Sequence, residues 1–167
     1  LAGILKRHPR AQVFVAVGDN HVRRVLVAKI ASQAPGVEFA VIAHPTATLC
    51  DGCILGRGAF VAAGAVVGTG ATVGPFAIVN THASLDHHAS LGEFASLAPM
   101  SATGGNVSIG AGSAIGMGAV VHHGVRIGAN TVLGSLSLAN RDLPDNVVAF
   151  GSPARVIRPR QPGEHYL

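Results

Sequence analysis

An aliphatic side chain recurs at every sixth position through the middle of the chain. An α-helix would repeat its apolar positions at steps of three and four residues, and a half-buried strand would alternate every two, so this period fits neither element. The next position, and the one four residues after the aliphatic, are mostly Gly or Ala. Only Thr103 breaks the aliphatic rule among the positions in phase, which are Leu49, Leu55, Val61, Val67, Val73, Val79, Leu85, Leu91, Leu97, Thr103, Ile109, Ile115, Val121, Ile127 and Leu133.

Each six-residue unit is typical of a short strand followed by a turn. Three units close one triangular coil of eighteen residues, in which the aliphatic side chain points inward and only small residues fit beside it at the corner. Successive coils then pair as parallel strands about 4.8 Å apart, without any pairing between distant segments. Residues 43–48 resemble a partial coil before the first complete one. The pattern predicts a mainly β protein, with a left-handed parallel β-helix over residues 37–139.

The segment before the repeat has a different pattern. Residues 13–17 form an apolar run typical of a strand, and a turn at residues 18–20 precedes a segment with helical spacing over residues 20–32. Asp19 or Asn20 can cap this helix, and Pro35 follows its end. Its expected apolar stripe consists of Val22, Val25, Leu26 and Ile30.

One strand and one helix cannot make a core, and the sequence begins at Leu1 rather than Met. We therefore interpret residues 1–36 as the remnant of an N-terminal Rossmann-like α/β domain. Residues 37–139 are the β-helix. Residues 140–167 leave the six-residue phase, and we expect them to form a C-terminal cap and tail that covers the open end of the coil.

Composition excludes several classes of protein. The chain has 22 Gly, no Trp and only 12% charged residues, yet 49% of it is hydrophobic and its mean hydropathy is +0.44. No apolar stretch reaches the roughly 18 residues that a membrane-spanning helix needs, and no leader with a cleavage site is evident. We expect a cytoplasmic protein that does not associate with membranes.

The net charge and the two cysteines do not point to a particular function. The formal net charge is +4, but Lys and Arg are scattered and cluster only at Arg155, Arg158 and Arg160, so we expect no nucleic-acid partner. This mild basicity also suits small ligands that carry phosphate. Cys50 and Cys53 form an isolated CxxC with no second pair of ligands at a suitable spacing, so we expect them to be packing residues and predict no metal.

Candidate chemistry comes from the eighteen-residue coil, because residues eighteen apart lie in one column. His87 then has Gly105 one strand spacing above it. An imidazole, with an unperturbed pKa of about 6.5, can take a proton from an attacking amine or hydroxyl near neutral pH. The Gly105 N–H could donate to the oxyanion of a tetrahedral intermediate, and Asp86 could orient His87 or hold the acceptor. The column as a whole is Asp51, Thr69, His87, Gly105 and His123.

His82, His87 and His88 lie near one level, and we expect at least one of them to act in catalysis, whereas we expect His8, His21, His44 and His165 to be inert. His122 and His123 lie two coils beyond His87, about 10 Å away on the strand spacing, so we expect them to be bystanders. The two thiols lie two coils below it, which favours direct transfer over an acyl-cysteine step. One triangular prism offers no deep pocket at a corner, so we expect the site to form between the subunits of a homotrimer.

Several stretches together identify a family. They are Val17-Gly18-Asp19-Asn20, His44-Pro45, Asn80-Thr81 with Asp86-His87, Gly92-Glu93-Phe94, Gly104-Gly105-Asn106-Val107 and Gly151-Ser152-Pro153-Ala154-Arg155. With them the chain resembles hexapeptide-repeat acetyltransferases, specifically the group of sialic-acid O-acetyltransferases and UDP-4-amino-sugar N-acetyltransferases. The resemblance implies a trimer, an N-terminal domain that binds the nucleotide sugar, and acetyl-CoA as acyl donor in the groove between adjacent β-helices.

The resemblance also implies roles for individual residues. His87 would be the general base and Gly105 the donor to the thioester carbonyl. The family often has an acidic residue directly after the histidine, where this chain has His88. Acceptor-binding residues would be Asn80, Asp86, His88, Gly18 and Asn20, and coenzyme-binding residues would be Gly105, Met117, Gly134, Ser135 and Arg155.

The preferred function is acetyl transfer to the amino group of a nucleotide-linked 4-amino sugar, because Asp86 suits a cationic amine that must lose a proton. O-acetylation of sialic acid or another sugar hydroxyl is the first alternative. A γ-type carbonic anhydrase is the second; it needs three histidines on zinc, and His82 lies five residues before His87, but the candidate third positions hold Thr46 and Asp51. A non-catalytic trimeric scaffold is the third.

Overall fold

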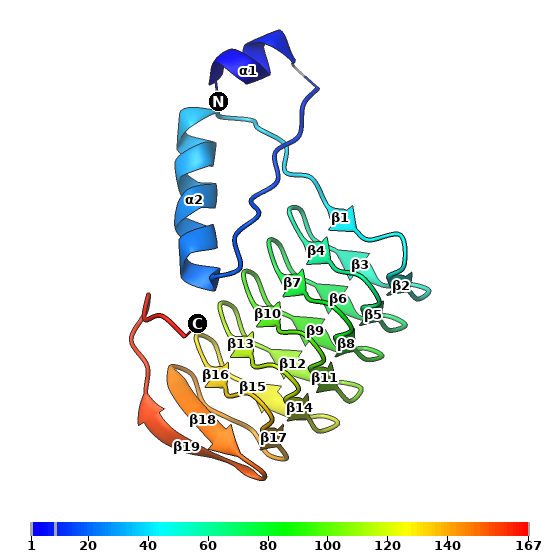
Figure 1. Cartoon of the computed structure of the whole chain (residues 1–167), viewed down its shortest axis with the longest axis vertical. Helices are drawn as coiled ribbons and strands as arrows, with labels where there is room; N and C mark the ends of the chain where they lie inside the picture. The colour runs from blue at the N-terminus through cyan, green and yellow to red at the C-terminus, as the bar shows by residue number, and fades with distance from the viewer. Residues whose placement is uncertain (1, 9, 167) are drawn as a thin grey trace.

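In the computed structural model, which describes residues 2–8 and 10–166, the chain is a triangular parallel β-helix with helical segments at one end (Figure 1). Paired strands lie eighteen residues apart: Ile42 pairs with Phe60, and Ala43 with Val61. The helices are α1 (Ala2–Arg7) and α2 (Asn20–Gln33). The predicted parallel coil is confirmed, and its left-handed sense stays a prediction.

Three sheets form the faces of the prism. The eight-stranded sheet contains β1 (Ile42–Ala43), β4 (Phe60–Val61), β7 (Ile78–Val79), β10 (Ser96–Leu97), β13 (Ala114–Ile115), β16 (Val132–Leu133), β18 (Val147–Gly151) and β19 (Ala154–Pro159). The six-stranded sheet contains β2 (Thr48–Leu49), β5 (Val66–Val67), β8 (Ser84–Leu85), β11 (Ala102–Thr103), β14 (Val120–Val121) and β17 (Leu138–Ala139). The five-stranded sheet contains β3 (Ile54–Leu55), β6 (Thr72–Val73), β9 (Ser90–Leu91), β12 (Ser108–Ile109) and β15 (Arg126–Ile127).

Three columns of turns join the sheets. The Asn80 corner (turns at 80–83, 98–101, 116–119 and 134–137) leads from the eight-stranded to the six-stranded sheet. The His87 corner (turns at 86–89, 104–107 and 122–125) leads from there to the five-stranded sheet. The Phe76 corner (turns at 74–77, 92–95, 110–113 and 128–131) leads back to the eight-stranded sheet.

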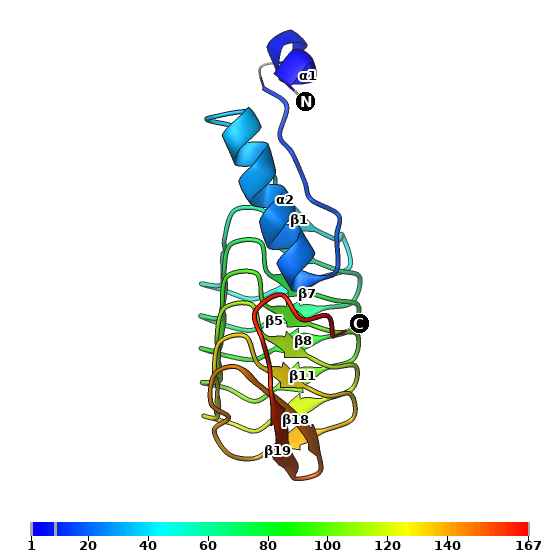
Figure 2. The same ribbon diagram turned by 90° about the vertical axis from the view of Figure 1, so that its left-hand side faces the viewer.

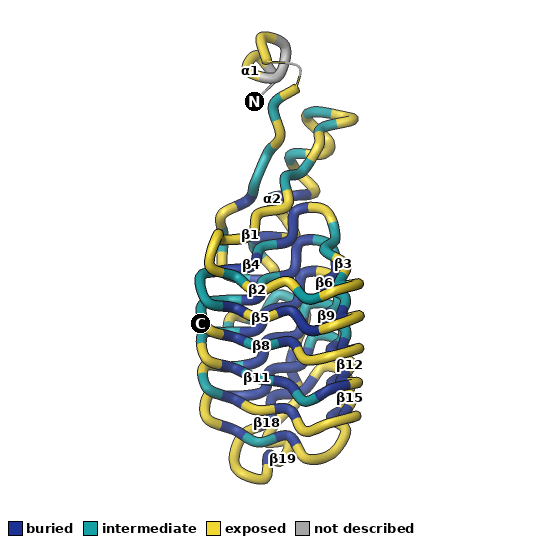
Figure 3. The backbone as a smooth tube through the Cα atoms, turned by 90° about the vertical axis from the view of Figure 1, so that its right-hand side faces the viewer, coloured by how far each residue is buried: buried dark blue, intermediate teal, exposed yellow. Residues whose placement is uncertain are grey.

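The core is the column of inward aliphatic side chains that the period predicts. They are buried from Val61 to Leu133, whereas Leu49 at the open end is partly exposed. The turns are unequally exposed around this core: residues 86–88 and 122–124 of the His87 corner are exposed, whereas Phe76 and Phe94 of the Phe76 corner are buried (Figure 3). Small residues are required beside it: a Cβ on Gly110 would lie 2.4 Å from the backbone nitrogen of Ala129 in the next coil. Thr103 can occupy a position in this aliphatic column because its hydroxyl accepts a hydrogen bond from the Asp86 N–H at 3.0 Å.

The C-terminal segment covers the last coil. β18 pairs in parallel with β16, and β19 returns antiparallel to β18 (Figure 2). From β19 the chain runs back toward the start of α2, and Tyr166 packs against the outer face of the eight-stranded sheet. This arrangement fits the expected cap, while the division of the chain into three domains stays a prediction.

Helix α2 begins where the sequence predicts, because the Asp19 carboxylate accepts from the Val22 N–H at 2.8 Å. The predicted apolar stripe is wrong in one respect: Val25 is 51% exposed, and Val27 is buried instead. The buried face consists of Asn20, Arg23 and Val27. The apolar spacing did not predict this face because two of its three residues are polar. The strand expected over residues 13–17 is reduced to a single parallel bridge from Val13 to Phe39, so the Rossmann-like remnant stays a prediction.

Arg23 fastens α2 to the Phe76 corner. It is buried, and its five hydrogen bonds go to the carbonyls of Val17, Gly18, Phe76 and Phe94 and to the side chain of Asn20. Desolvation lowers the pKa of Arg23 to about 10. Beside it the rings of Phe76 and Phe94 stack at 5.0 Å. Neither described helix has the length and apolar character needed to cross a bilayer.

Candidate active site

The turn that presents His87 follows β8 and precedes β9. Hydrogen bonds close this turn and hold it to both adjacent coils: the Ala89 N–H donates to the Asp86 carbonyl at 3.2 Å, the His88 N–H to the Thr69 carbonyl and the Asn106 N–H to the His87 carbonyl, both at 2.9 Å. His88 lies in the left-handed region with φ of 55°, as the third residue of this turn requires. The imidazoles of His87 and His88 both project outward and are exposed. A rigid core therefore holds two titratable side chains at one corner.

Gly105 lies directly against the His87 ring, as the eighteen-residue column predicts. A Cβ on Gly105 would be 2.2 Å from both Cε1 and Nε2 of that ring, a distance that real contacts never show. The backbone itself accepts alanine here, because Ala63, Ala111 and Ala129 occupy the equivalent turn position. No residue that the structure describes accepts a hydrogen bond from the Gly105 N–H. The corner thus joins an imidazole to an unused backbone donor.

Among the described residues, the Asp86 carboxylate bonds to the backbone of His87 and makes no hydrogen bond to its ring. Its Oδ1 accepts from the backbone N–H of His87 at 2.7 Å, so this oxygen holds the turn. The contact to the ring comes from His88, whose Nδ1 lies 3.2 Å from the Nδ1 of His87. When His87 donates through Nδ1, its Nε2 keeps a lone pair and can act as a base. His88 therefore occupies the place of an orienting partner.

His123 is nearer to His87 than the strand spacing suggested. The two ring centroids are 6.1 Å apart, which corrects the expected separation of about 10 Å. The intervening coil has Gly104 and Gly105 at this corner, so no side chain separates the rings. The rings of His87 and His123 therefore face each other across Gly104 and Gly105, while the His88 ring lies against Gly70 in the preceding coil.

A groove of about 270 Å³ lies along the eight-stranded sheet and the Asn80 corner, where that sheet meets the six-stranded sheet. Met117, Gly134 and Ser135, three of the four coenzyme-binding candidates outside the His87 corner, line it. Asn80 and Gly18, both acceptor-binding candidates, line it too. The floor is apolar, with the outward-facing Ile78, Ala114 and Val132 among its residues. The ring of Phe150 lies over Gly134, where a Cβ would come within 1.8 Å of its Cε1.

The remaining candidates lie elsewhere. Arg155 does not line the groove, and its Nη1 donates to the carbonyl of Ala154 at 2.9 Å. Asn20 is 2% exposed; its amide nitrogen donates to the Ser113 carbonyl at 3.1 Å and its oxygen accepts from Arg23. These contacts favour a structural role for Asn20 over substrate binding. The Asn80 side chain accepts from the Thr81 N–H at 2.8 Å, one corner away from His87.

Some residues of the site gave no signal in the sequence. Tyr166 lines the groove from the C-terminal tail, where burial raises the pKa of its phenol and a hydrogen bond with Ser96 offsets part of that rise. Phe150 and Tyr166 both follow the repeat, where no period places them relative to a column.

The structure separates the two histidines of the carbonic anhydrase alternative. His82 belongs to the Asn80 corner, with its ring 2.4 Å from where a Cβ of Gly64 would lie, and His87 belongs to the next corner. Within residues 2–8 and 10–166, no three His, Cys, Asp or Glu side chains gather closely enough to hold a metal ion. Cys50 and Cys53 are free and half-buried, and Cys53 packs against the core.

Part of the repeat matches known transferases in sequence. Residues 106–138 match the family model described as bacterial transferase hexapeptide (six repeats). A stretch of 35 residues, 21% of this chain, is 63% identical to the galactoside O-acetyltransferase of Lactococcus lactis. That stretch spans only 17% of the length of this curated relative.

Solved structures match over nearly the whole chain. PerB from Caulobacter crescentus, solved with CoA and GDP-perosamine, has 38% identity and a TM-score of 0.86, over 92% of this chain and 73% of its own. The acetyltransferase domain of PglB from Neisseria gonorrhoeae has 31% identity and a TM-score of 0.83, over 93% of this chain and 77% of its own. The same domain has also been solved in complex with acetyl coenzyme A.

Proposed function

This chain belongs to the hexapeptide-repeat acetyltransferases, and from that premise we propose that it transfers an acetyl group from acetyl-CoA to the amino group of a nucleotide-linked 4-amino sugar. The observation that carries the proposal is the contact of the His87 ring with Gly105, whose N–H is free of partners among the described residues. The two groups supply a proton acceptor and an oxyanion donor at one corner.

The chemistry needs only these two groups beside the substrates. The sugar amine attacks the thioester carbonyl carbon, forming the C–N bond, while its proton passes to Nε2 of His87. The negative charge on the carbonyl oxygen is stabilised by the Gly105 N–H. The C–S bond then breaks, and the proton leaves His87 for the coenzyme thiolate. No covalent intermediate on the protein is required.

The groove at the Asn80 corner suits the pantetheine arm of acetyl-CoA. Its apolar floor and polar edges are typical of sites that bind an extended amide chain. It lies at a different corner from His87, so one chain alone does not bring the thioester to the imidazole. A second copy is needed if the groove holds the coenzyme.

A threefold arrangement of chains would supply this second copy. The six-stranded sheet joins the Asn80 corner to the His87 corner, so three copies packed through this sheet would bring each Asn80 corner to a neighbour's His87 corner. The outer face of that sheet offers apolar Val66 and Val120, and Leu136 at the adjoining corner is 81% exposed. We therefore propose a homotrimer with the reaction site between subunits.

His88 is proposed to keep the Nε2 of His87 available as the base. His88→Gly should lower kcat about tenfold with little change in KM, because it removes the acceptor for the Nδ1 proton. His88→Asp should keep most of the activity, because a carboxylate restores that acceptor. Both replacements tolerate the left-handed backbone at this position, so stability should not separate them. Equal kcat for the wild type and the His88→Gly variant would remove His88 from the mechanism.

An amine acceptor is favoured by the match to PerB, whose crystals contain GDP-perosamine, and by Asp86 beside His87. Hydroxyl transfer is the second candidate, because a stretch of 35 residues is 63% identical to a galactoside O-acetyltransferase. Release of free CoA should be measured with GDP- and UDP-linked 4-amino sugars, with sialic acid and with a galactoside. We expect turnover with a 4-amino sugar nucleotide; turnover with the hydroxyl acceptors alone would assign the second function.

A further inference from the structure

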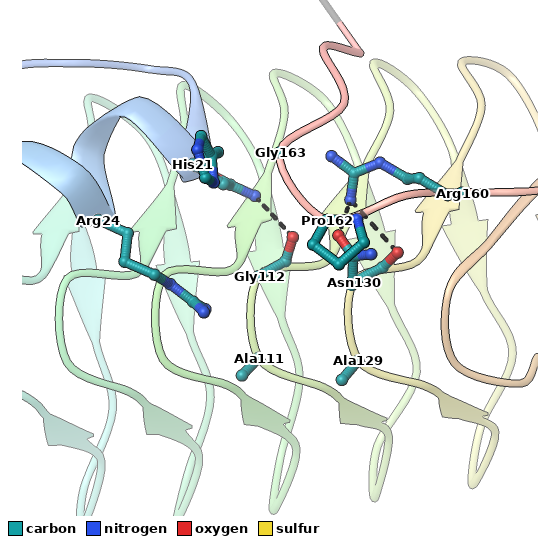
Figure 4. Close-up of a pocket in the computed structure, with 10 residues that line it drawn as sticks. His21, Arg24, Ala111, Gly112, Ala129, Asn130, Arg160, Pro162 and Gly163 are labelled. Atoms are coloured by element: carbon teal, nitrogen blue, oxygen red, sulfur yellow. Dashed lines mark hydrogen bonds between the residues drawn. The ribbon is translucent and has the colours of Figure 1, made fainter.

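A second cavity, of about 230 Å³, lies at the Phe76 corner between the start of α2 and the C-terminal tail (Figure 4). The turns at 110–113 and 128–131 form its floor, and Pro162 and Gly163 form one wall. It shares no lining residue with the groove at the Asn80 corner. It also lies at the corner that the proposed trimer contact does not use.

Two arginines give this cavity a positive charge. Arg24 and Arg160 line it together with His21, and no Asp or Glu is among its lining residues. Asp19 and Glu164 are the acidic residues nearest in sequence to the residues that line the cavity. Asp19 caps α2 and lies 3.5 Å from His165, and Glu164 pairs with Arg158 and bonds to the Gln161 N–H. Both carboxylates are therefore engaged outside the cavity.

Arg24 presents free donors to the cavity. Its guanidinium lies 5.0 Å from the centroid of the Phe94 ring, which fixes its position without using its N–H groups. It makes no salt bridge or side-chain hydrogen bond to any residue that the structure describes. Its Nη2 lies 3.2 Å from where a Cβ of Gly112 would be, so the glycine leaves room for the group. Figure 4 shows this side chain extending over the turn at 110–113.

Arg160 adds a buried charge to the same place. The residue is 4% exposed; Nη1 donates to Asn130 and Nη2 to the Glu164 carbonyl at 2.8 Å. Its buried Nε has no hydrogen-bond partner among the described residues. A charge held in a region of low dielectric acts on a nearby ligand with little screening. An anion in the cavity would compensate for it.

We propose that this cavity binds the phosphate or diphosphate group of a small-molecule substrate, with Arg24 as the principal contact. Arg24 is suited to this role because a planar guanidinium with unused donors binds phosphate oxygens in pairs. The identity of the ligand rests on the proposed function, in which both substrates carry phosphate: the nucleotide sugar through its diphosphate, and CoA through its diphosphate and 3′-phosphate.

The test measures binding of inorganic pyrophosphate to the full chain by calorimetry. Arg24→Met should weaken binding about tenfold or more, because it removes a charge-assisted contact and keeps the hydrophobic stem over Phe94. Arg57→Met is the matched control, since Arg57 lies 5.5 Å over the Phe76 ring outside the cavity, and it should bind as the wild type does. His21→Gln provides a second variant of the cavity and should weaken binding to a smaller extent.

Further ligands identify the source of the phosphate. Weaker binding of CoA but not of dephospho-CoA by Arg24→Met assigns the 3′-phosphate, and weaker binding of both assigns the coenzyme diphosphate. Weaker binding of GDP or UDP alone assigns the nucleotide sugar. Absence of binding by the wild type, or equal losses in Arg24→Met and Arg57→Met, would overturn the proposal. Pyrophosphate binding does not require acetyl transfer, so a His87 variant should bind it normally even if the proposed reaction proves wrong.

Discussion

Replacing His87 by alanine is expected to lower kcat for acetyl transfer by about 10²- to 10⁴-fold, the usual contribution of a positioned general base. The ring is exposed and makes no contact with the aliphatic core, so the melting temperature should stay close to that of the wild type. Binding of acetyl-CoA should change little, because the coenzyme groove lies at another corner. Steady-state kinetics together with thermal unfolding measure both quantities.

His44→Ala is the control for this variant. His44 is also an exposed histidine in a turn of the coil, but its Nδ1 bonds to Thr46 near the open end, away from Gly105. Its replacement should leave kcat unchanged. A His87→Ala variant that keeps wild-type kcat would contradict the role of this imidazole as the base.

Gly105→Ala should have the second-largest effect, a loss in kcat of about 10²-fold, because a displacement of about 1 Å in a reacting group costs this much. The added methyl would lie 2.2 Å from Nε2 of His87, so the exposed ring must move away. Stability should fall little, since alanine already occupies the equivalent turn position at Ala63, Ala111 and Ala129. Kinetics and thermal unfolding again separate the two effects.

A double-mutant cycle shows whether the two residues act as a unit. If the methyl acts by displacing the imidazole, Gly105→Ala should cost almost nothing further in the His87→Ala background. Gly3→Ala, in α1, is the steric control, because the position of its Cβ is open. Losses that multiply in the double variant would show that Gly105 acts independently of the ring.

The coil could be predicted because its structure is determined by residues that are close together in the sequence. Each inward aliphatic, each small neighbour and each turn is set by a six-residue pattern, and the pairing of coils follows from that period. Even Thr103, the one exception, keeps the phase and uses its hydroxyl to hold the turn at Asp86. The N-terminal segment has no such period, so burial of Arg23 and Asn20 in place of Val25 could not be inferred from apolar spacing.

At the site, only contacts between residues of one column could be predicted from the sequence. The contact of Gly105 with His87 follows from positions eighteen apart. The directions of side chains do not, which is why the contact with His88 and the proximity of His123 emerge only in the structure. Tyr166 and Arg160 reach their cavities through a tail that follows no repeat.

The transfer of acetyl groups at the contact between neighbouring chains can be tested with a crystal structure of the protein bound to CoA and a 4-amino sugar nucleotide. We expect the coenzyme in the groove of one chain, with its sulfur and the sugar amine at the His87 corner of a neighbouring chain and the amine about 3 Å from Nε2. A sulfur bound far from every His87 ring, or an acceptor amine that contacts other groups, would contradict it.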